Sequence, residues 1–236
     1  MLFSFFSAII ALTFFLGVLA LQQRKSQLNA GRSAYQIYQS FFASFAAYFA
    51  LLTGANVLPI SHDVAQLALY LGLYVFLFVG LAFCLRFTIQ IGGHPIVANT
   101  VFSAVSMLGI VMFLYRLTNL PIPQVHTVGA LFLYRNPNYT AGEILLTTIG
   151  IVITAAVFAV AFFRTGKSAL VVAIRKRSYF MAAGAMVAAA GGVGYFTSHL
   201  FSVAYVPYIA TGSLVPAVIG FALMVYPLLS HHDNNE

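Results

Sequence analysis

Seven long apolar segments constrain this chain more than any motif in it. A helix needs about 20 residues to cross a hydrocarbon core of about 30 Å. Segments of that length lie at approximately 2–21, 40–59, 65–86, 97–116, 142–163, 178–198 and 204–229. A transmembrane β-barrel requires alternating strands of about ten residues, and continuous runs such as FFASFAAYFALL do not fit that pattern. The sequence therefore predicts an all-α fold, a polytopic bundle of seven transmembrane helices.

The composition predicts a single membrane domain over the whole chain, 1–236. Apolar residues make up 61% of the sequence and charged residues 6%, which lies far outside the usage of soluble domains. No linker and no change of composition divides the chain into parts. The lipid bilayer is therefore the expected partner of most of its surface.

The basic residues predict how the bundle is oriented. Nine of the eleven Lys and Arg residues follow the first, third or fifth segment: Arg24, Lys25, Arg32, Arg86, Arg164, Lys167, Arg175, Lys176 and Arg177. Connections rich in Lys and Arg stay in the cytoplasm. We therefore expect an outside amino terminus, a cytoplasmic carboxyl terminus and a multi-pass protein of a bacterial cytoplasmic membrane. The same asymmetry accounts for the net charge of +7 without a nucleic-acid partner.

Motifs for enzymatic chemistry are missing from the sequence. It contains no HExxH, no GxSxG and no glycine-rich dinucleotide fingerprint. The GKS at 166–168 lacks the glycine five positions earlier that a phosphate-binding loop requires, because that position is Ala161. The single Cys84 is typical of a small packing residue. We therefore expect no enzyme activity, no cofactor and no metal site.

The longest connection, 117–140, is expected to form a hairpin-like loop on the outer side. Pro121 and Pro123 stiffen its start. After them, apolar and polar residues alternate loosely on both sides of an expected turn at Gly129-Ala130. The pattern from Thr140 to Glu143 matches a capping box, so Glu143 is interpreted as a helix cap rather than as an acid catalyst.

Six residues near the outer ends of the segments are candidates for binding or sensing a ligand. They are His62, Asp63, His126, Tyr134, Arg135 and His199. Imidazole titrates near physiological pH and binds zinc readily, so a cluster of these groups would be chemically useful. Their scattered positions fit separate interfacial residues as well. The sequence alone leaves open whether they converge.

Ionisable residues are scarce within the segments, but two other patterns lie inside them. Asn99, Ser103 and Ser106 share one helix face by their spacing, and this intramembrane polar face serves either helix packing or a ligand. Gly184, Ala188 and Gly192 recur every four residues and predict close helix packing, against a helix of the same chain or of a second copy.

The order and length of the segments resemble the amino-terminal seven-helix sensory region of bacterial histidine kinases and diguanylate cyclases. The stretches that carry the resemblance are ALTFFLGVLALQQRKSQLNAGRSAYQIYQSFFASFAAYFALL, LYVFLFVGLAFCLRFT, the outer loop with His126, and RKRSYFMAAGAMVAAAGGVGYF. The resemblance implies a receptor whose outer face perceives a ligand or a membrane state. It also implies that the seventh helix passes the signal to a cytoplasmic output domain.

The sequence departs from that family after the last segment, where only SHHDNNE follows. We therefore expect a separate protein partner to supply the output, or a homodimer to form. The alternative is a small-molecule transporter or a lipid-handling protein with a site between its helices. Pro207, Gly212, Pro216 and Gly220 favour this alternative, because they are expected to break the last helix and open a cavity.

Overall fold

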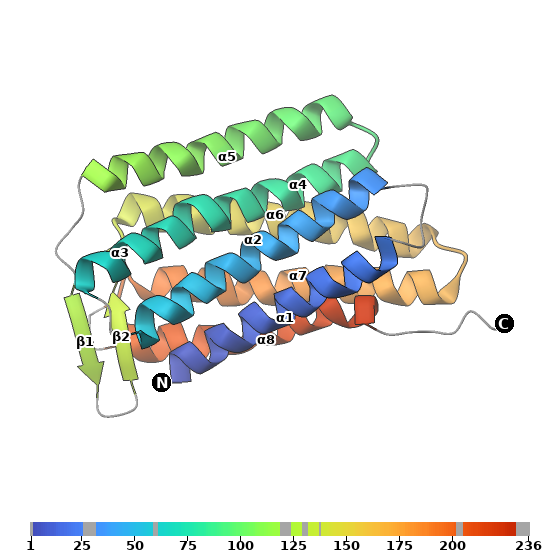
Figure 1. The fold of residues 1–236 in the computed structure, drawn as a ribbon. Coiled ribbons are helices and arrows are strands. Elements are labelled where there is room, and N and C mark those ends of the chain that lie inside the picture. The colour runs from blue at the N-terminus through green and yellow to red at the C-terminus, as the bar shows by residue number, and fades with distance from the viewer. Residues whose placement is uncertain are drawn as a thin grey trace.

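The computed structural model describes residues 2–25, 32–58, 61–118, 124–128, 132–136, 138–201 and 205–229. Within these ranges, seven helical spans are long and apolar enough to cross a membrane, as predicted (Figure 1). Their elements are α1 (Leu2–Lys25), α2 (Arg32–Val57), α3 (His62–Tyr70), η1 (Leu71–Leu77), α4 (Phe78–Ile91), α5 (Pro95–Thr118), α6 (Ala141–Ser168), α7 (Val172–Ser198) and α8 (Val206–Leu229). α3, η1 and α4 together form the third span.

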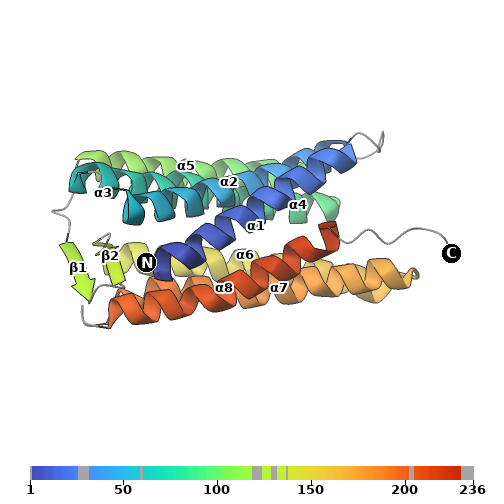
Figure 2. The ribbon, with the colours of Figure 1, turned by 60° about the horizontal axis from the view of Figure 1, so that its bottom comes forward.

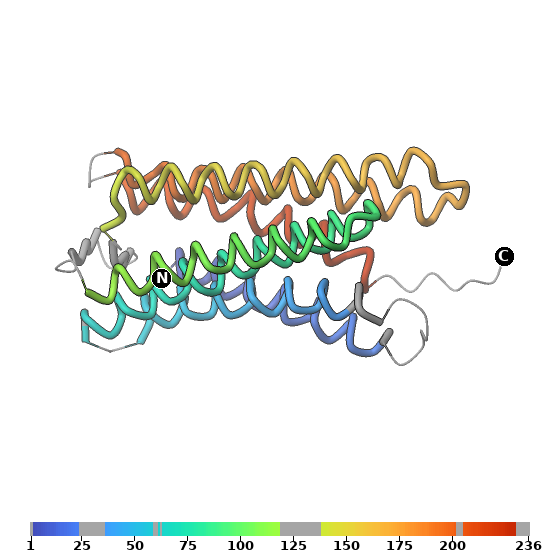
Figure 3. Tube along the Cα trace, turned by 90° about the horizontal axis from the view of Figure 1, so that it is seen from above, coloured from blue at the N-terminus to red at the C-terminus, as the bar shows by residue number. Residues whose placement is uncertain are grey.

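Several helices continue past the ends that hydropathy indicates, mainly at the end of the bundle where α6 and α7 are joined. α6 runs to Ser168 instead of 163, and α7 begins at Val172 instead of 178. Hydropathy marks only the stretch inside hydrocarbon, whereas backbone hydrogen bonds continue a helix into the headgroup region. The 28 residues of α6 span about 42 Å. The joined ends of α6 and α7 reach beyond the adjacent ends of α4 and α5 (Figure 3).

The last helix is continuous, contrary to the expected breaks. α8 runs from Val206 to Leu229 with Pro216 and Pro227 inside it. Proline removes one backbone donor, but a membrane helix tolerates this when its neighbours hold it in place. Here α8 packs against α7 and α1.

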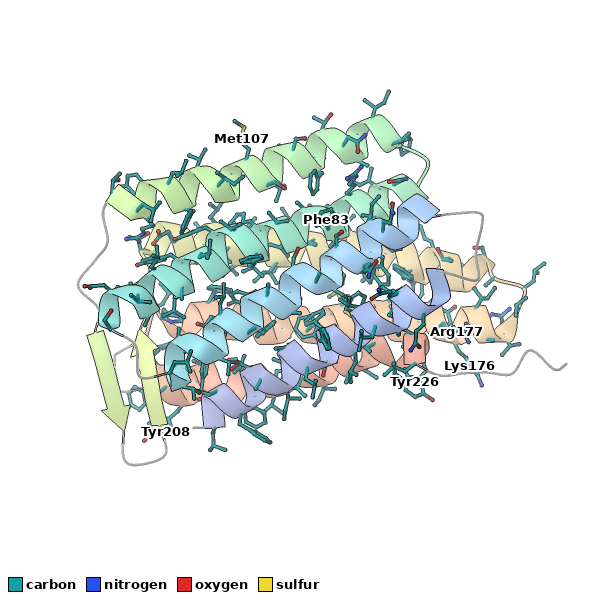
Figure 4. The ribbon with its side chains drawn as sticks, viewed as in Figure 1. Phe83, Met107, Lys176, Arg177, Tyr208 and Tyr226 are labelled. Atoms are coloured by element: carbon teal, nitrogen blue, oxygen red, sulfur yellow. The ribbon has the colours of Figure 1, made fainter. Side chains whose placement is uncertain are left out.

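Six of the spans close into a ring, and α5 lies outside it. Contacts run from α1 to α2, α2 to α4, α4 to α6, α6 to α7, α7 to α8, and α8 back to α1. α5 packs mainly on α4 and η1, and it forms the upper edge of the bundle in Figure 1. Met107 of α5 points away from the other helices and is 67% exposed (Figure 4). The outer face of α5 is therefore a surface for lipid.

Aromatic side chains fill the part of the core between α1, α2 and α8. Phe14 is fully buried, and its ring centroid lies 5.4 Å from Phe42, 5.2 Å from Phe45 and 4.4 Å from Phe221. Such tilted and stacked pairs add about 0.5–1.5 kcal/mol each to the burial of their surface.

The third span contains a turn of π-helix, η1, between α3 and α4. Short π-helical segments inside α-helices are rare and occur frequently at functional sites. This one carries Tyr74, whose ring stacks on that of Tyr70 with centroids 5.8 Å apart. Gly109 of α5 lies so close that a side chain there would collide with Phe78 and the carbonyl of Tyr74. η1 therefore fixes how α5 approaches the ring.

The connection between α5 and α6 contains an antiparallel hairpin. β1 (Gln124–Val128) pairs with β2 (Phe132–Asn136), and the register places His126 opposite Tyr134. β2 lies near α1 and α2. The hairpin and the start of α1 share one end of the bundle, and the end of α8 lies at the other (Figure 2). We call these the hairpin end and the basic end.

Candidate functional site

A buried ion pair between α5 and α6 is the main polar feature of the hairpin end. Arg116 is 6% exposed and Glu143 is 5% exposed. The Nε and one terminal nitrogen of Arg116 donate to the two carboxylate oxygens of Glu143. Such bidentate pairs are among the stronger hydrogen-bonded contacts in proteins. The sequence placed both residues at segment ends but did not indicate that they pair.

Further groups complete the coordination of the Glu143 carboxylate. Tyr74 donates its hydroxyl to Oε1, although it lies 69 residues away in the sequence. Thr140 donates its backbone N–H and its hydroxyl to Oε2, at 2.6 and 2.9 Å. The Thr140 hydroxyl also accepts from the Glu143 N–H, which completes the capping box. Glu143 therefore acts as the helix cap that the sequence predicts, and its carboxylate also forms the ion pair with Arg116.

Aromatic residues connect this ion pair to the end of α7. The guanidinium of Arg116 lies 5.1 Å from the ring centroid of Tyr70, a cation–π geometry. Tyr139 then contacts Tyr70 at 6.3 Å and His199 at 5.0 Å between ring centroids. These residues, with Tyr74 and Glu143, form what we call the hairpin-end cluster.

His199 lies just beyond the last residue of α7, Ser198. Its Nδ1 donates to the carbonyl of Tyr195 at 3.1 Å, and its ring centroid lies 5.3 Å from that of Tyr195. Burial disfavours the imidazolium and lowers the pKa of His199 to about 4, although the nearby carbonyls of Phe196 and Tyr195 act in the opposite direction. His199 is therefore neutral at physiological pH.

An apolar cavity of about 80 Å³ lies at the centre of the helix ring. α2, the third span, α6, α7 and α8 each contribute residues to its wall, among them Phe45, Leu81, Phe158, Ala188 and Phe221. Tyr195 and Phe196 also line it. The polar lining is small, so an apolar molecule fits this site better than an ion.

The cavity and the hairpin-end cluster share residues of α7. Phe196 contacts Tyr139 with ring centroids 5.8 Å apart, and Tyr195 contacts His199. An occupant of the cavity would therefore touch side chains that also belong to the hairpin end. No sequence motif marks the cavity, because its residues come from five spans.

All six candidate sensing residues belong to elements at the hairpin end. His62 and Asp63 begin α3, while His126, Tyr134 and Arg135 lie in the hairpin strands. Asp63 is exposed. The side chains of His62, His126, Tyr134 and Arg135 lie outside the part of the structure that is described. Of the six, His199 joins the hairpin-end cluster.

The intramembrane polar face lies on the peripheral helix α5. Asn99 and Ser103 are exposed there, and Ser106 is half-buried. The Oγ of Ser106 has no hydrogen-bond partner among the described residues. None of the three lines the central cavity. Asn99 and Ser103 therefore lie on the exposed surface of α5, and Ser106 is only partly covered.

The small residues of α7 pack within the chain. A Cβ at Gly184 would lie 2.6 Å from the carbonyl oxygen of Gly220, and Ala188 lies against Gly220 as well. Gly192 faces α6 instead, where a Cβ would lie 3.3 Å from Ile151. Gly191, which the four-residue pattern omits, contacts Ala217 and belongs to the same crossing with α8.

These features define a multi-pass α-helical membrane protein with a central apolar cavity. In the described ranges, no group of three or more His, Cys, Asp or Glu side chains is arranged to hold a metal ion. Comparison with protein-family models and with curated proteins finds no match. The function must therefore be argued from the site itself.

Proposed function

We propose that this chain is a non-enzymatic, sensor-like membrane module that binds a small apolar ligand and regulates a separate protein. The observation that carries the proposal is the cavity at the centre of the helix ring. Buried apolar cavities stay dry and take up small apolar molecules; an engineered cavity of about 150 Å³ takes up benzene or xenon. This cavity is about 80 Å³, so its ligand is smaller than benzene. The lipid phase concentrates such molecules around the helices.

The position of the cavity supports a sensing role. Five spans meet at its wall, so an occupant changes the packing of most of the ring. Tyr195 and Phe196 join it to the hairpin-end cluster, which includes the candidate His199. The π-helical segment also borders it through Leu77. The ligand thus contacts the elements best placed to shift between two arrangements.

The basic end offers a surface for the regulated partner. α6 and α7 extend there beyond α4 and α5 (Figure 3). Leu170 in the turn between them is 93% exposed, and Val171 and Val172 are more than half exposed. We propose that a separate protein, or a second copy of this chain, is regulated through this turn.

Photolabelling with a short alkyl diazirine, a probe small enough for a cavity of about 80 Å³, tests ligand binding in the purified protein. We expect labelling of peptides that contain Phe158 or Tyr195, reduced under xenon pressure. Ala155→Leu adds three carbon atoms to the cavity wall, and it should abolish this competed labelling. Ala156→Leu is the matched control, because Ala156 is the next residue and is exposed. Equal competed labelling in both variants would contradict the cavity as the site.

Cross-linking in native membranes tests the regulatory role. The recovery of a cross-linked partner or second copy should differ between Ala155→Leu and Ala156→Leu. Leu170→Ser should lower this recovery without changing the photolabelling. A chain that stays monomeric, with no partner and no ligand-dependent change, would exclude the sensor proposal.

A transporter or lipid-handling protein is the second candidate, and one observation favours it. Pro216 has no N–H to donate to the carbonyl of Gly212, four residues earlier in α8, and in the sequence it lies between Leu214 and Ala217, which both line the cavity. Uptake and lipid-turnover assays in proteoliposomes distinguish this function from the first. Under the second candidate, Ala155→Leu should abolish that activity, because it fills the cavity, and Ala156→Leu should not. Under the first candidate no uptake or turnover occurs.

A further inference from the structure

A groove runs along the lipid-facing surface between α6 and α7, near the basic end. Ala159, Ala182 and Ala183 provide small side chains along it, and Phe163 and Met186 border it. Phe163 is 56% exposed and Met186 is 53% exposed. The groove is separate from the central cavity, and the two share no lining residue.

The antiparallel packing of the two helices fixes the direction and length of the groove. A Cβ at Gly166 would lie 2.8 Å from the ring of Tyr179, so these residues are level with each other. Seven residues farther from the turn on each helix, Ala159 is level with Met186. At 1.5 Å per residue, the groove is about 10 Å long. The groove therefore runs along the axes of the two helices, as an acyl chain beside a membrane-spanning helix does.

Charged groups lie only at the end of the groove nearest the turn. Arg164 and Lys167 line it there, beside Tyr179. In the part of the chain that the structure describes, the ion pair of Arg116 and Glu143 is the one recorded, so Arg164 and Lys167 have no acidic partner. The groove thus combines an apolar channel with an unneutralised basic mouth.

We propose that this groove binds one anionic phospholipid. The phosphate lies against Arg164 and Lys167, and one acyl chain follows the three alanines. Basic pockets between transmembrane helices bind anionic headgroups in this way. Free phosphate would not use the apolar channel, and a zwitterionic lipid would not use the unpaired charges. The complementarity of both parts therefore favours a phospholipid with a net negative headgroup.

The absence of tryptophan from the chain allows a direct test. The F163W variant places a single fluorophore at the groove, and I96W places one on α5, where Ile96 is 81% exposed at the same end of the bundle. Each variant is reconstituted in phosphatidylcholine vesicles with increasing dibrominated phosphatidylglycerol, or with dibrominated phosphatidylcholine. Bromine quenches indole on contact, so the curves give the binding constant of each lipid at each position.

We expect the ratio of the binding constants for phosphatidylglycerol and phosphatidylcholine to be higher at F163W than at I96W. A basic side chain at a membrane surface contributes about 1 kcal/mol, or about fivefold. Adding K167Q to F163W should therefore lower the preference by about fivefold. Adding K176Q, the matched removal of an exposed lysine at the start of α7 (Figure 4), should leave it unchanged.

A second pair of variants tests the apolar channel. Adding A183L to F163W should exclude the acyl chain and weaken quenching by both brominated lipids. A190L, seven residues along α7 at another exposed alanine, should not. Equal preferences in F163W and I96W, or equal losses from K167Q and K176Q, would overturn the proposal in favour of diffuse attraction. An unchanged F163W/A183L curve would overturn the assigned chain position.

Discussion

Arg116 and Glu143, 27 residues apart, form a buried ion pair that joins the peripheral helix α5 to the first turn of α6. α5 otherwise packs mainly on α4 and η1. The ion pair therefore ties α5 to α6, the next helix in the sequence. Tyr74 from η1 donates to the same carboxylate. Three of the seven spans therefore meet at one side chain.

Removal of one partner should destabilise the protein strongly. Glu143→Ala or Arg116→Met leaves the remaining charge without its counter-ion in a buried site, and each should lower the free energy of unfolding by about 3–5 kcal/mol. The R116M/E143A double variant should lose less stability than the sum of the two single losses. Reversible unfolding in mixed detergent micelles measures all four proteins of this cycle. Strictly additive losses would mean that the two side chains do not interact.

The crossing of α7 and α8 should not tolerate a methyl group. Gly220→Ala places a Cβ against Gly184 and Ala188, and we expect it to lower the free energy of unfolding by about 1–3 kcal/mol. Gly212→Ala in the same helix meets nothing within 4 Å. That control should change the stability by at most about 1 kcal/mol, toward greater stability. Comparable losses in the two variants would contradict close packing at Gly220.

Thr147 of α6 is 1% exposed, and its hydroxyl has no hydrogen-bond partner among the described residues. Burial of an unpaired hydroxyl is unfavourable by about 1–3 kcal/mol. Thr147→Val keeps the shape and removes that group, so it should raise the melting temperature in detergent. Thr165→Val is the control, since Thr165 is exposed and already donates to the carbonyl of Ala161. A lower melting temperature for Thr147→Val would show that the hydroxyl has a partner.

The stability of the protein should fall as the pH decreases from about 6.5 to 4. Burial lowers the pKa of His199 to about 4, whereas an unfolded chain binds the proton near 6.5. The unfolded state therefore binds more protons in this range, and its proton uptake favours unfolding. Melting curves at several pH values measure the effect.

His199→Gln should flatten this pH dependence relative to the wild-type chain. His94→Gln serves as the control, because His94 lies exposed in the turn after α4. A wild-type curve that His199→Gln does not change would assign the pH response to other groups.

Much of the fold follows from local sequence patterns. The seven spans were predictable because each segment must satisfy its own backbone hydrogen bonds in lipid, which leaves helix as the local solution. The cap of α6 was predictable because Thr140 and Glu143 lie in one turn. Close packing at Gly184 and Ala188 was also indicated, since small residues at helical spacing permit it.

Other features depended on contacts between distant segments. No local pattern indicates that Tyr74 reaches Glu143 across 69 residues, or that α5 lies outside the ring. The expected breaks in α8 were wrong, because packing against α1 and α7 keeps a proline-containing helix continuous. The sequence by itself determined which segments cross the membrane, because hydropathy and helix formation act within a segment. Only the tertiary structure decided which side chains share the ion pair and the cavity, because these arise where separate helices pack.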